Sequence, residues 1–151
     1  MSAFSFTGRV GFRSSVSDAK GPPGEAAILA LNPRRVEGIR AATQWSRVEP
    51  GSLNLEVGDD VVPSLHALTP TWIEDGSSVV YPAGYEHIPK LRGAYLYYLA
   101  EAHANAKTEQ VLVRTARNAL LRRVELFAPL SLKDVFGLRS GDTLKVVVSA
   151  I

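Results

Sequence analysis

The feature that most constrains this chain is a succession of short apolar segments, each followed by a turn signal. Leu53, Leu55 and Val57, for example, alternate with polar residues after the turn at Pro50-Gly51, which is the pattern of a half-buried strand. We assign such strands to residues 4–12, 53–57, 61–68, 78–81, 110–114, 124–127 and 143–149. Several short strands without an internal repeat favour a β-barrel or a β-sandwich.

One helix is predicted over residues 33–43. Asn32 is placed to cap it and Pro33 occupies its first turn, while Val36 and Ile39 are spaced for one helical face. Residues 14–24, rich in serine, glycine and proline, read as a surface loop that separates the first strand from this helix.

A second, short helix is predicted to begin at Ser131, with Asp134 three positions on and Gly137 at its C-terminal end. Residues 90–106 stay undecided, because their leucines, alanines and Glu101 favour a helix while Tyr95 and Tyr97 alternate as in a strand.

Composition limits the class of protein. The 151 residues are 46% hydrophobic, which is enough for one core, so we expect a single domain over residues 1–151. The formal net charge of +2 is too small to demand nucleic acid as a partner. The chain has no cysteine, which excludes disulfides, thiolate metal sites and a cysteine nucleophile. No segment looks like a signal peptide or a membrane span, so the expected location is the cytoplasm and no membrane partner is expected.

Ser52 and Asn54 are the first candidate site residues. They lie two positions apart in a predicted strand and therefore point to the same face. Their neutral oxygens suit a hard cation such as Mg²⁺ that takes its remaining charge neutralisation from phosphates. The alternative is that both residues simply form the solvent face of a strand whose leucines face the core.

The second candidate region is Glu125 with the start of the helix near Ser131. A carboxylate within an apolar strand is followed by a helix start, where free N–H groups favour anions. Alternatively, Ser131 only caps the helix, Lys133 is solvated, and Glu125 pairs with Arg122 or Arg123.

Other familiar chemistry is absent from the sequence. His66, His87 and His103 lack metal-site spacing and are interpreted as surface or satisfied core residues. There is no G-x-S-x-G elbow and no Walker motif. Seven scattered arginines on the predicted helix and in the C-terminal half either track a nucleic-acid backbone or form a solvated face. They are Arg34, Arg35, Arg40, Arg114, Arg117, Arg122 and Arg123.

Two motifs in order resemble those of one family. Gly51-Ser52-Leu53-Asn54 is similar to the G-T-L-N signature of the archaeal-type CTP-dependent riboflavin kinases. Residues 124–129 (V-E-L-F-A-P), with residues 138–148, resemble that family's E-x-x-A-P element, helix, G-D turn and closing strand. The resemblance covers most of the chain loosely and about a quarter of it well.

The resemblance implies a fold, a cofactor and site residues. The fold would be mainly β, a compact six-stranded cradle-loop barrel with short inserted helices, in which residues 94–103 form a strand. Ser52 and Asn54 would hold Mg²⁺, and Glu125 with Thr115 would bind the flavin. The nucleotide would contact Gly8, Val10, Gly11, Arg13, Leu130, Ser131, Leu132 and Lys133. None of these residues is assigned a catalytic role.

The sequence departs from the family in its first loop. The family's first strand runs into a glycine-rich S-G-x-G-E-G loop against the nucleotide, whereas here Gly11 is followed by Phe12, Arg13 and serines. Side chains at these positions crowd the approach of backbone N–H groups to phosphates. Arg13 with the serines offers another way to bind phosphate.

Three functions follow as hypotheses. The first is a riboflavin kinase-like phosphotransferase that uses CTP or another nucleoside triphosphate to phosphorylate riboflavin or a related alcohol. The second is a non-catalytic relative that binds flavin or another small molecule. The third is a dimeric DNA-binding barrel of swapped hairpins, because residues 138–148 also resemble the L-x-x-G-D-x-V-x-V hairpins of such regulators.

Overall fold

Seven strands and six short helices make up the computed structural model, which describes residues 3–11, 24–118 and 121–149. The strands are β1 (Ala3–Val10), β2 (Leu53–Glu56), β3 (Trp72–Asp75), β4 (Ala94–Ala104), β5 (Lys107–Ala116), β6 (Arg123–Phe127) and β7 (Thr143–Ser149). The helices are α1 (Glu25–Leu31), α2 (Pro33–Thr43), α3 (Val61–His66), the 3-10 turn η1 (Gly76–Ser78), α4 (His87–Arg92) and α5 (Leu132–Phe136).

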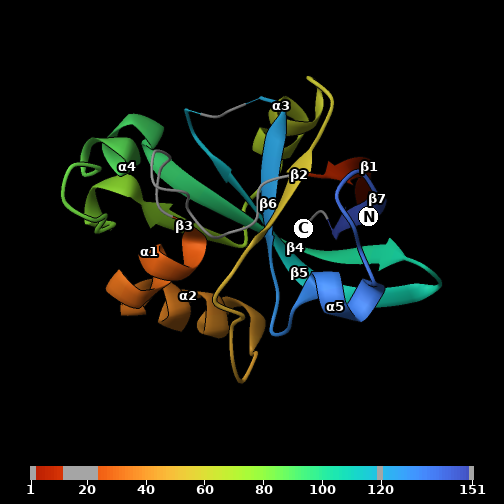
Figure 1. Ribbon diagram of the computed structural model, residues 1–151. Coiled ribbons are helices and arrows are strands. Elements are labelled where there is room, and N and C mark those ends of the chain that lie inside the picture. The colour runs from red at the N-terminus through yellow and green to blue at the C-terminus, as the bar shows by residue number, and fades with distance from the viewer. Residues whose placement is uncertain (1–2, 12–23, 119–120, 150–151) are drawn as a thin grey trace.

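Six of the strands close into an antiparallel barrel, as the sequence patterns and the resemblance predict. The order is β4-β5-β6-β2-β1-β7, and pairing of β7 with residues 100–103 of β4 completes the circle. β3 lies outside the circle and pairs with the first half of β4, at Trp72 with Tyr97. One half of the long strand β4 therefore pairs with β7 and closes the barrel, and the other half pairs with the outer strand β3 (Figure 1).

The barrel strands separate two hydrophobic clusters. Alternate residues of each strand, such as Leu53, Leu126 and Val113, fill the barrel interior, to which α3 and α5 add apolar side chains. The opposite faces of β4, β5 and β6 form a second cluster with α1 and α2, around Tyr97 and Phe127. Figure 1 shows these two helices together below β3, on the outside of the barrel. Polar residues on the part of this face that α1 and α2 overlie, such as Arg114, are therefore covered by protein.

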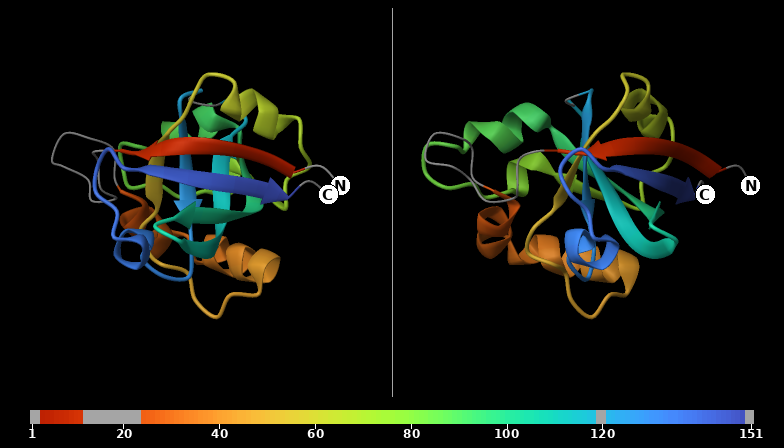
Figure 2. Two further views of the ribbon diagram at one scale, coloured as in Figure 1. Left: turned by 90° about the vertical axis from the view of Figure 1, so that its right-hand side faces the viewer. Right: turned by 45° about the vertical axis from the view of Figure 1, so that its right-hand side comes forward.

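The first and last described strands lie side by side. β1 pairs with β7 along its length, from Ala3 opposite Ser149 to Arg9 opposite Thr143. β1 reaches its other neighbour, β2, only through Arg9 and Val10. Figure 2 shows the two strands running together across one side of the barrel.

Two of the predicted strands are wrong. Residues 61–66 form helix α3, because Val61, Val62 and Leu65 lie on one helical face that is buried in the barrel core. Residues 78–81 are not a strand either: their backbone is held at Val80 by the side chain of Asn32. The strand in this region is β3, which the sequence pattern did not reveal.

Residues 90–106, for which the sequence favoured neither a helix nor a strand, contain the end of a helix and a strand. Helix α4 ends at Arg92, Gly93 adopts a φ of +78°, and β4 then begins at Ala94. A positive φ is easily reached only by glycine, so Gly93 separates the two elements. The strand that the resemblance implies over residues 94–103 is confirmed.

Both predicted helices are confirmed, over Pro33–Thr43 and after Ser131, whose hydroxyl accepts the Asp134 N–H. Asn32 precedes α2 as expected, but its side chain makes no capping bond. The apolar run at residues 28–31 is part of an additional helix, α1. The predicted loop at residues 14–24 and Phe12 of the first predicted strand lie outside the described residues, apart from Gly24. Among the helices described, none is long and apolar enough to span a membrane.

Candidate functional site

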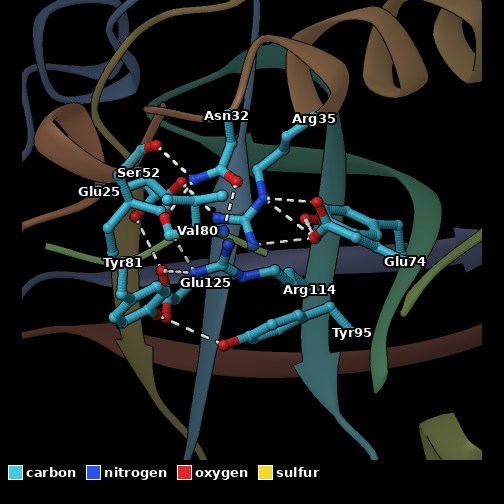
Figure 3. A network of polar contacts seen from close by, with 12 residues as sticks. Glu25, Asn32, Arg35, Ser52, Glu74, Val80, Tyr81, Tyr95, Arg114 and Glu125 are labelled. Carbon is cyan, nitrogen blue, oxygen red and sulfur yellow. Dashed lines mark hydrogen bonds and ion pairs between the residues drawn. The ribbon is translucent and has the colours of Figure 1, made fainter. Parts of the chain in front are cut away.

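A row of five side chains crosses the outer face of the sheet. The strand register aligns Asn54 with Glu125, Glu125 with Arg114, Arg114 with Tyr97, and Tyr97 with Trp72. Directly opposed residues on neighbouring strands point to the same face. Residues that are far apart in the sequence therefore share one surface, which α1 and α2 partly cover (Figure 3).

Glu125 is bound from two sides. Its Oε2 accepts hydrogen bonds from the Ser52 hydroxyl at 2.9 Å and from Arg114 Nη2 at 2.6 Å. Burial alone would raise the pKa of Glu125, but the charges of Arg114 and Arg123 and these two hydrogen bonds lower it to about 2. The carboxylate is therefore ionised at neutral pH.

Arg114 joins the barrel to helix α1. The same Nη2 lies 2.8 Å from Glu25 of α1, and the guanidinium carbon lies 5.1 Å from the Tyr95 ring centroid and 4.8 Å from that of Phe127. Burial would lower the pKa of Arg114, but the carboxylates of Glu125 and Glu25 raise it well above its usual value. Arg114 is thus a permanent buried cation.

Arg35 continues the network on helix α2. Its Nε lies 3.0 Å from both carboxylate oxygens of Glu74, and its Nη1 donates to Glu25 at 2.9 Å. The Tyr97 hydroxyl donates to Glu74 as well, at 2.9 Å. The Arg35 side chain is 0% exposed. Glu25 therefore bridges two arginines and ties both covering helices to the sheet.

Asn32 fixes the junction between these two helices. Its side-chain amide donates to the carbonyls of Ile28 and Val80, each at 2.7 Å, and accepts the Val80 N–H at 2.8 Å. These three bonds occupy the Asn32 side-chain amide with partners outside α2. The side chain is therefore not free to cap that helix.

The interpretation of the arginines as one solvated or nucleic-acid-binding set needs correction, because Arg35 and Arg114 are buried. Of the two predicted partners of Glu125, Arg123 forms a long ion pair with it at 4.0 Å, whereas Arg122 pairs with Asp59. The closest partner, Arg114, was not predicted. The burial of Arg35 could have been predicted from the sequence, since Arg35 stands four residues before the apolar Ile39 on the same helical face. No local signal marks Glu25 or Glu74.

The predicted metal pair lies on the outer face with Glu125. Leu53 and Leu55 are buried and Asn54 is half-buried, so the predicted strand register is confirmed. A hydroxyl, an amide oxygen and a carboxylate form a set of hard oxygens that fits Mg²⁺. Arg114 already balances the charge of Glu125, so a cation here would depend on substrate phosphates. Within the described residues, no group of three or more His, Asp or Glu side chains is placed to hold a metal.

Thr115 and Glu125 do not face each other. Thr115 lies on the face of β5 that points into the barrel, and its hydroxyl lies 3.0 Å from Nε2 of His66 on α3. Glu125 is on the outer face. The side chains of the two residues that the resemblance assigns to the flavin thus point to opposite faces of the sheet, although both residues line one small cavity with Tyr95 and Arg114. Burial and the charge of Arg117 lower the pKa of His66, which favours its neutral form.

The predicted nucleotide residues divide into two groups. Gly8 and Val10 belong to β1, where Val10 is buried in the barrel core and Gly8 lies against Leu55. The Gly11 N–H donates to the Asn54 carbonyl at 3.0 Å, so the start of the altered loop adjoins the predicted metal pair. Arg13 lies outside the described residues.

The second group lines a cavity of about 380 Å³, named here the strand–turn cavity. One wall is the approach to β2, including Ser52, and the other is the turn at Leu130–Lys133 that follows β6. The remaining lining residues are Ala26, Glu49, Pro50, Gly51, Leu53, Leu126 and Ala128. A segment predicted to hold a metal and a segment predicted to contact a nucleotide thus share one cavity.

Comparison with models of known protein families finds no match for this chain, and comparison with characterised proteins finds no significant relative. The relation to the riboflavin kinases therefore stays a hypothesis that rests on the two sequence motifs.

Proposed function

We propose that this protein is a riboflavin kinase-like phosphotransferase that binds CTP or another nucleoside triphosphate in the strand–turn cavity. The acceptor would be riboflavin or a related alcohol. The observation that carries the proposal is the meeting of Ser52 with the turn at Leu130–Lys133 around one cavity. Its volume of about 380 Å³ lies within the range of small-molecule sites.

The lining of the cavity suits a phosphorylated ligand. Lys133 supplies an ammonium group and Ser131 a hydroxyl group that can donate to phosphate oxygens, while the Ser52 oxygen donates its proton to Glu125 and keeps lone pairs for a cation. Mg²⁺ arriving with the nucleotide would find its oxygen ligands at Ser52 and Asn54 and would neutralise charge on the transferred phosphoryl group. The remaining work of the protein is to position the donor phosphate and the acceptor hydroxyl against each other.

A non-catalytic, ligand-binding relative is the second candidate, and one observation favours it. Glu125, the family's acidic flavin residue by resemblance, is held by Arg114 and Ser52, while Thr115 bonds His66 on the other side of the sheet. Both residues thus have hydrogen-bond partners within the protein, although both also line the small cavity beside Tyr95 and Arg114. The DNA-binding alternative gains no support, because β7 closes the barrel by pairing with β1 and β4 of the same chain.

Two paired measurements test the proposal. Riboflavin and CTP are each titrated with Mg²⁺ present, by fluorescence quenching and by calorimetry, and FMN formation is followed separately. We expect CTP binding to weaken about tenfold or more in Lys133→Gln, since a charged hydrogen bond is lost. Lys145→Gln, at an exposed position on β7, is the matched control.

The outcomes separate the two candidates. Binding with turnover of about one per second or more supports the kinase. Binding without FMN formation supports the non-catalytic relative. Absence of CTP binding, or equal weakening by Lys133→Gln and Lys145→Gln, would contradict the proposed site.

A further inference from the structure

A second, smaller cavity lies beside Glu125. It has a volume of about 50 Å³ and includes Thr115 and Glu125, the two residues that the resemblance assigns to the flavin. The other lining residues are Arg92, Tyr95, Arg114, Ala116 and Arg123. One water needs about 10–15 Å³, so there is room for a few waters or one small anionic group. Its lining shares no residue with the strand–turn cavity. The Ser52–Glu125 hydrogen bond links the two linings, since Ser52 belongs to one and Glu125 to the other.

The charges around this cavity are unbalanced. The lining holds three arginines and one ionised glutamate. Arg123 has only Glu125, at 4.0 Å, and Arg92 forms no ion pair with any residue that the structure describes. Glu25 shares Arg114 but is not part of the lining. Because Arg114 is paired with both Glu25 and Glu125, the positive charge left without a close carboxylate lies at Arg92 and Arg123.

Arg114 also has unused hydrogen-bonding capacity. Its side chain is 5% exposed, and Nη2 makes both of its carboxylate contacts. Nη1 is buried without a hydrogen-bond partner in the described part of the chain. A buried charged donor without an acceptor costs free energy, and such a group usually indicates an acceptor that comes from a ligand or from water.

Tyr95 contributes a neutral donor. Burial and its contact with Tyr81 raise the pKa of Tyr95 well above its usual value, so its phenol keeps its proton. The Tyr95 hydroxyl lies 3.4 Å from that of Tyr81, which is a long contact that a stronger acceptor can replace.

We propose that this cavity binds the phosphate group of a small phosphate ester. Guanidinium groups match the oxygens of a phosphate in charge and in geometry, and a lining with three arginines suits a dianion better than a carboxylate. The proposal does not depend on the nucleotide site, because the two cavities have separate linings.

Calorimetric titration at constant low ionic strength tests the site with inorganic phosphate, glycerol phosphate and acetate. We expect both phosphate ligands to bind and acetate to bind at least tenfold more weakly. Arg123→Gln and Arg92→Gln should each weaken phosphate binding about tenfold. Arg34→Gln, at an exposed arginine on α2 outside the cavity, should leave it unchanged.

One further variant should bind phosphate more tightly than the wild-type protein does. Glu125→Gln removes the negative charge of the lining and should tighten phosphate binding severalfold, which a non-specific basic surface elsewhere would not do. Thermal melting of each variant checks that it is folded. Absence of phosphate binding by the wild-type protein, acetate binding as tight as that of phosphate, or equal losses in Arg34→Gln and Arg123→Gln would overturn the assignment.

Discussion

The Ser52 hydroxyl donates a hydrogen bond of 2.9 Å to Glu125, although 73 positions separate the two residues. The bond joins the approach to β2 with β6 and links the linings of two cavities. It also reduces the exposure of a carboxylate that Arg114 already neutralises. A single side chain from the G-S-L-N motif thus couples the motif to the ion network beneath α1.

Replacing Ser52 by alanine removes this bond. We expect the pKa of Glu125 to rise, because the Ser52 bond is one of the causes that lower it. We also expect a loss of about 1 kcal/mol in unfolding free energy, the net value of a typical hydrogen bond. NMR titration of the Glu125 carboxyl and urea unfolding measure the two effects. Ser52→Thr keeps the hydroxyl and serves as control, and an unchanged Glu125 titration in Ser52→Ala would contradict the contact.

Acid should destabilise the protein partly through Glu125. The folded-state pKa is lowered from 4.5 to about 2, so this carboxylate adds stability above pH 4.5 that is lost as the pH falls towards 2. The contribution is on the order of 3 kcal/mol at neutral pH. Glu125→Gln should unfold with a flatter dependence on pH over this range. Glu101→Gln, at an exposed position on β4, should keep the wild-type slope.

Arg35→Met should be strongly destabilising. It leaves Glu25 and Glu74 buried with less compensation, and breaking a buried ion pair from one side costs about 3–5 kcal/mol. Adding Glu74→Gln should recover part of the loss, because the stranded charge is then removed. Guanidinium unfolding of the single and double variants measures the coupling. Arg34→Met, on the exposed side of the same helix, should change little.

Tyr97 and Tyr98 should respond oppositely to loss of the hydroxyl. The Tyr97 hydroxyl donates to buried Glu74, so Tyr97→Phe should cost about 1–3 kcal/mol. The Tyr98 hydroxyl is buried without a hydrogen-bond partner among the described residues, so Tyr98→Phe should be neutral or stabilising. Thermal and urea unfolding of the two variants makes the comparison. Equal losses in both would show that the Tyr98 hydroxyl has an acceptor.

Gly38→Ala should destabilise the packing of α2. A methyl group at this position would clash with the indole ring of Trp72. Overpacking typically costs about 1–3 kcal/mol, which outweighs the roughly 1 kcal/mol that alanine gains over glycine within a helix. Trp72→Leu, combined with Gly38→Ala, should relieve the clash and make the alanine less costly than it is alone. Unfolding free energies of the single and double variants test this.

Strand alternation predicted the barrel interior well. Leu53, Leu55 and Leu126 follow a period of two and are buried as that period requires. Helix α3 was misassigned because Val61, Val62 and Leu65 fit a short apolar strand as easily as one face of a six-residue helix. A segment this short has too few helical turns for its hydrophobic periodicity to distinguish a helix from a strand.

The candidate site was only partly predictable, for a different reason. Ser52, Asn54 and Glu125 belong to motifs and were found from the sequence. Glu25 and Glu74 come from a covering helix and an outer strand, and their burial depends on tertiary pairing with Arg35 and Arg114. Nothing local distinguishes these carboxylates from solvated ones, since the same residue types are mostly exposed in proteins.

The pairing of β1 with β7 has a consequence for the order of folding. Residues 3–8 of β1 have β7 as their only strand neighbour in the described structure, so they gain a hydrogen-bonded partner only after residues 143–149 have been synthesised. Contacts between such distant segments carry the largest loop-closure entropy and slow the folding of a domain. During translation β1 therefore waits as an unpaired strand, exposed to aggregation or to chaperones, until the last strand emerges and completes the barrel.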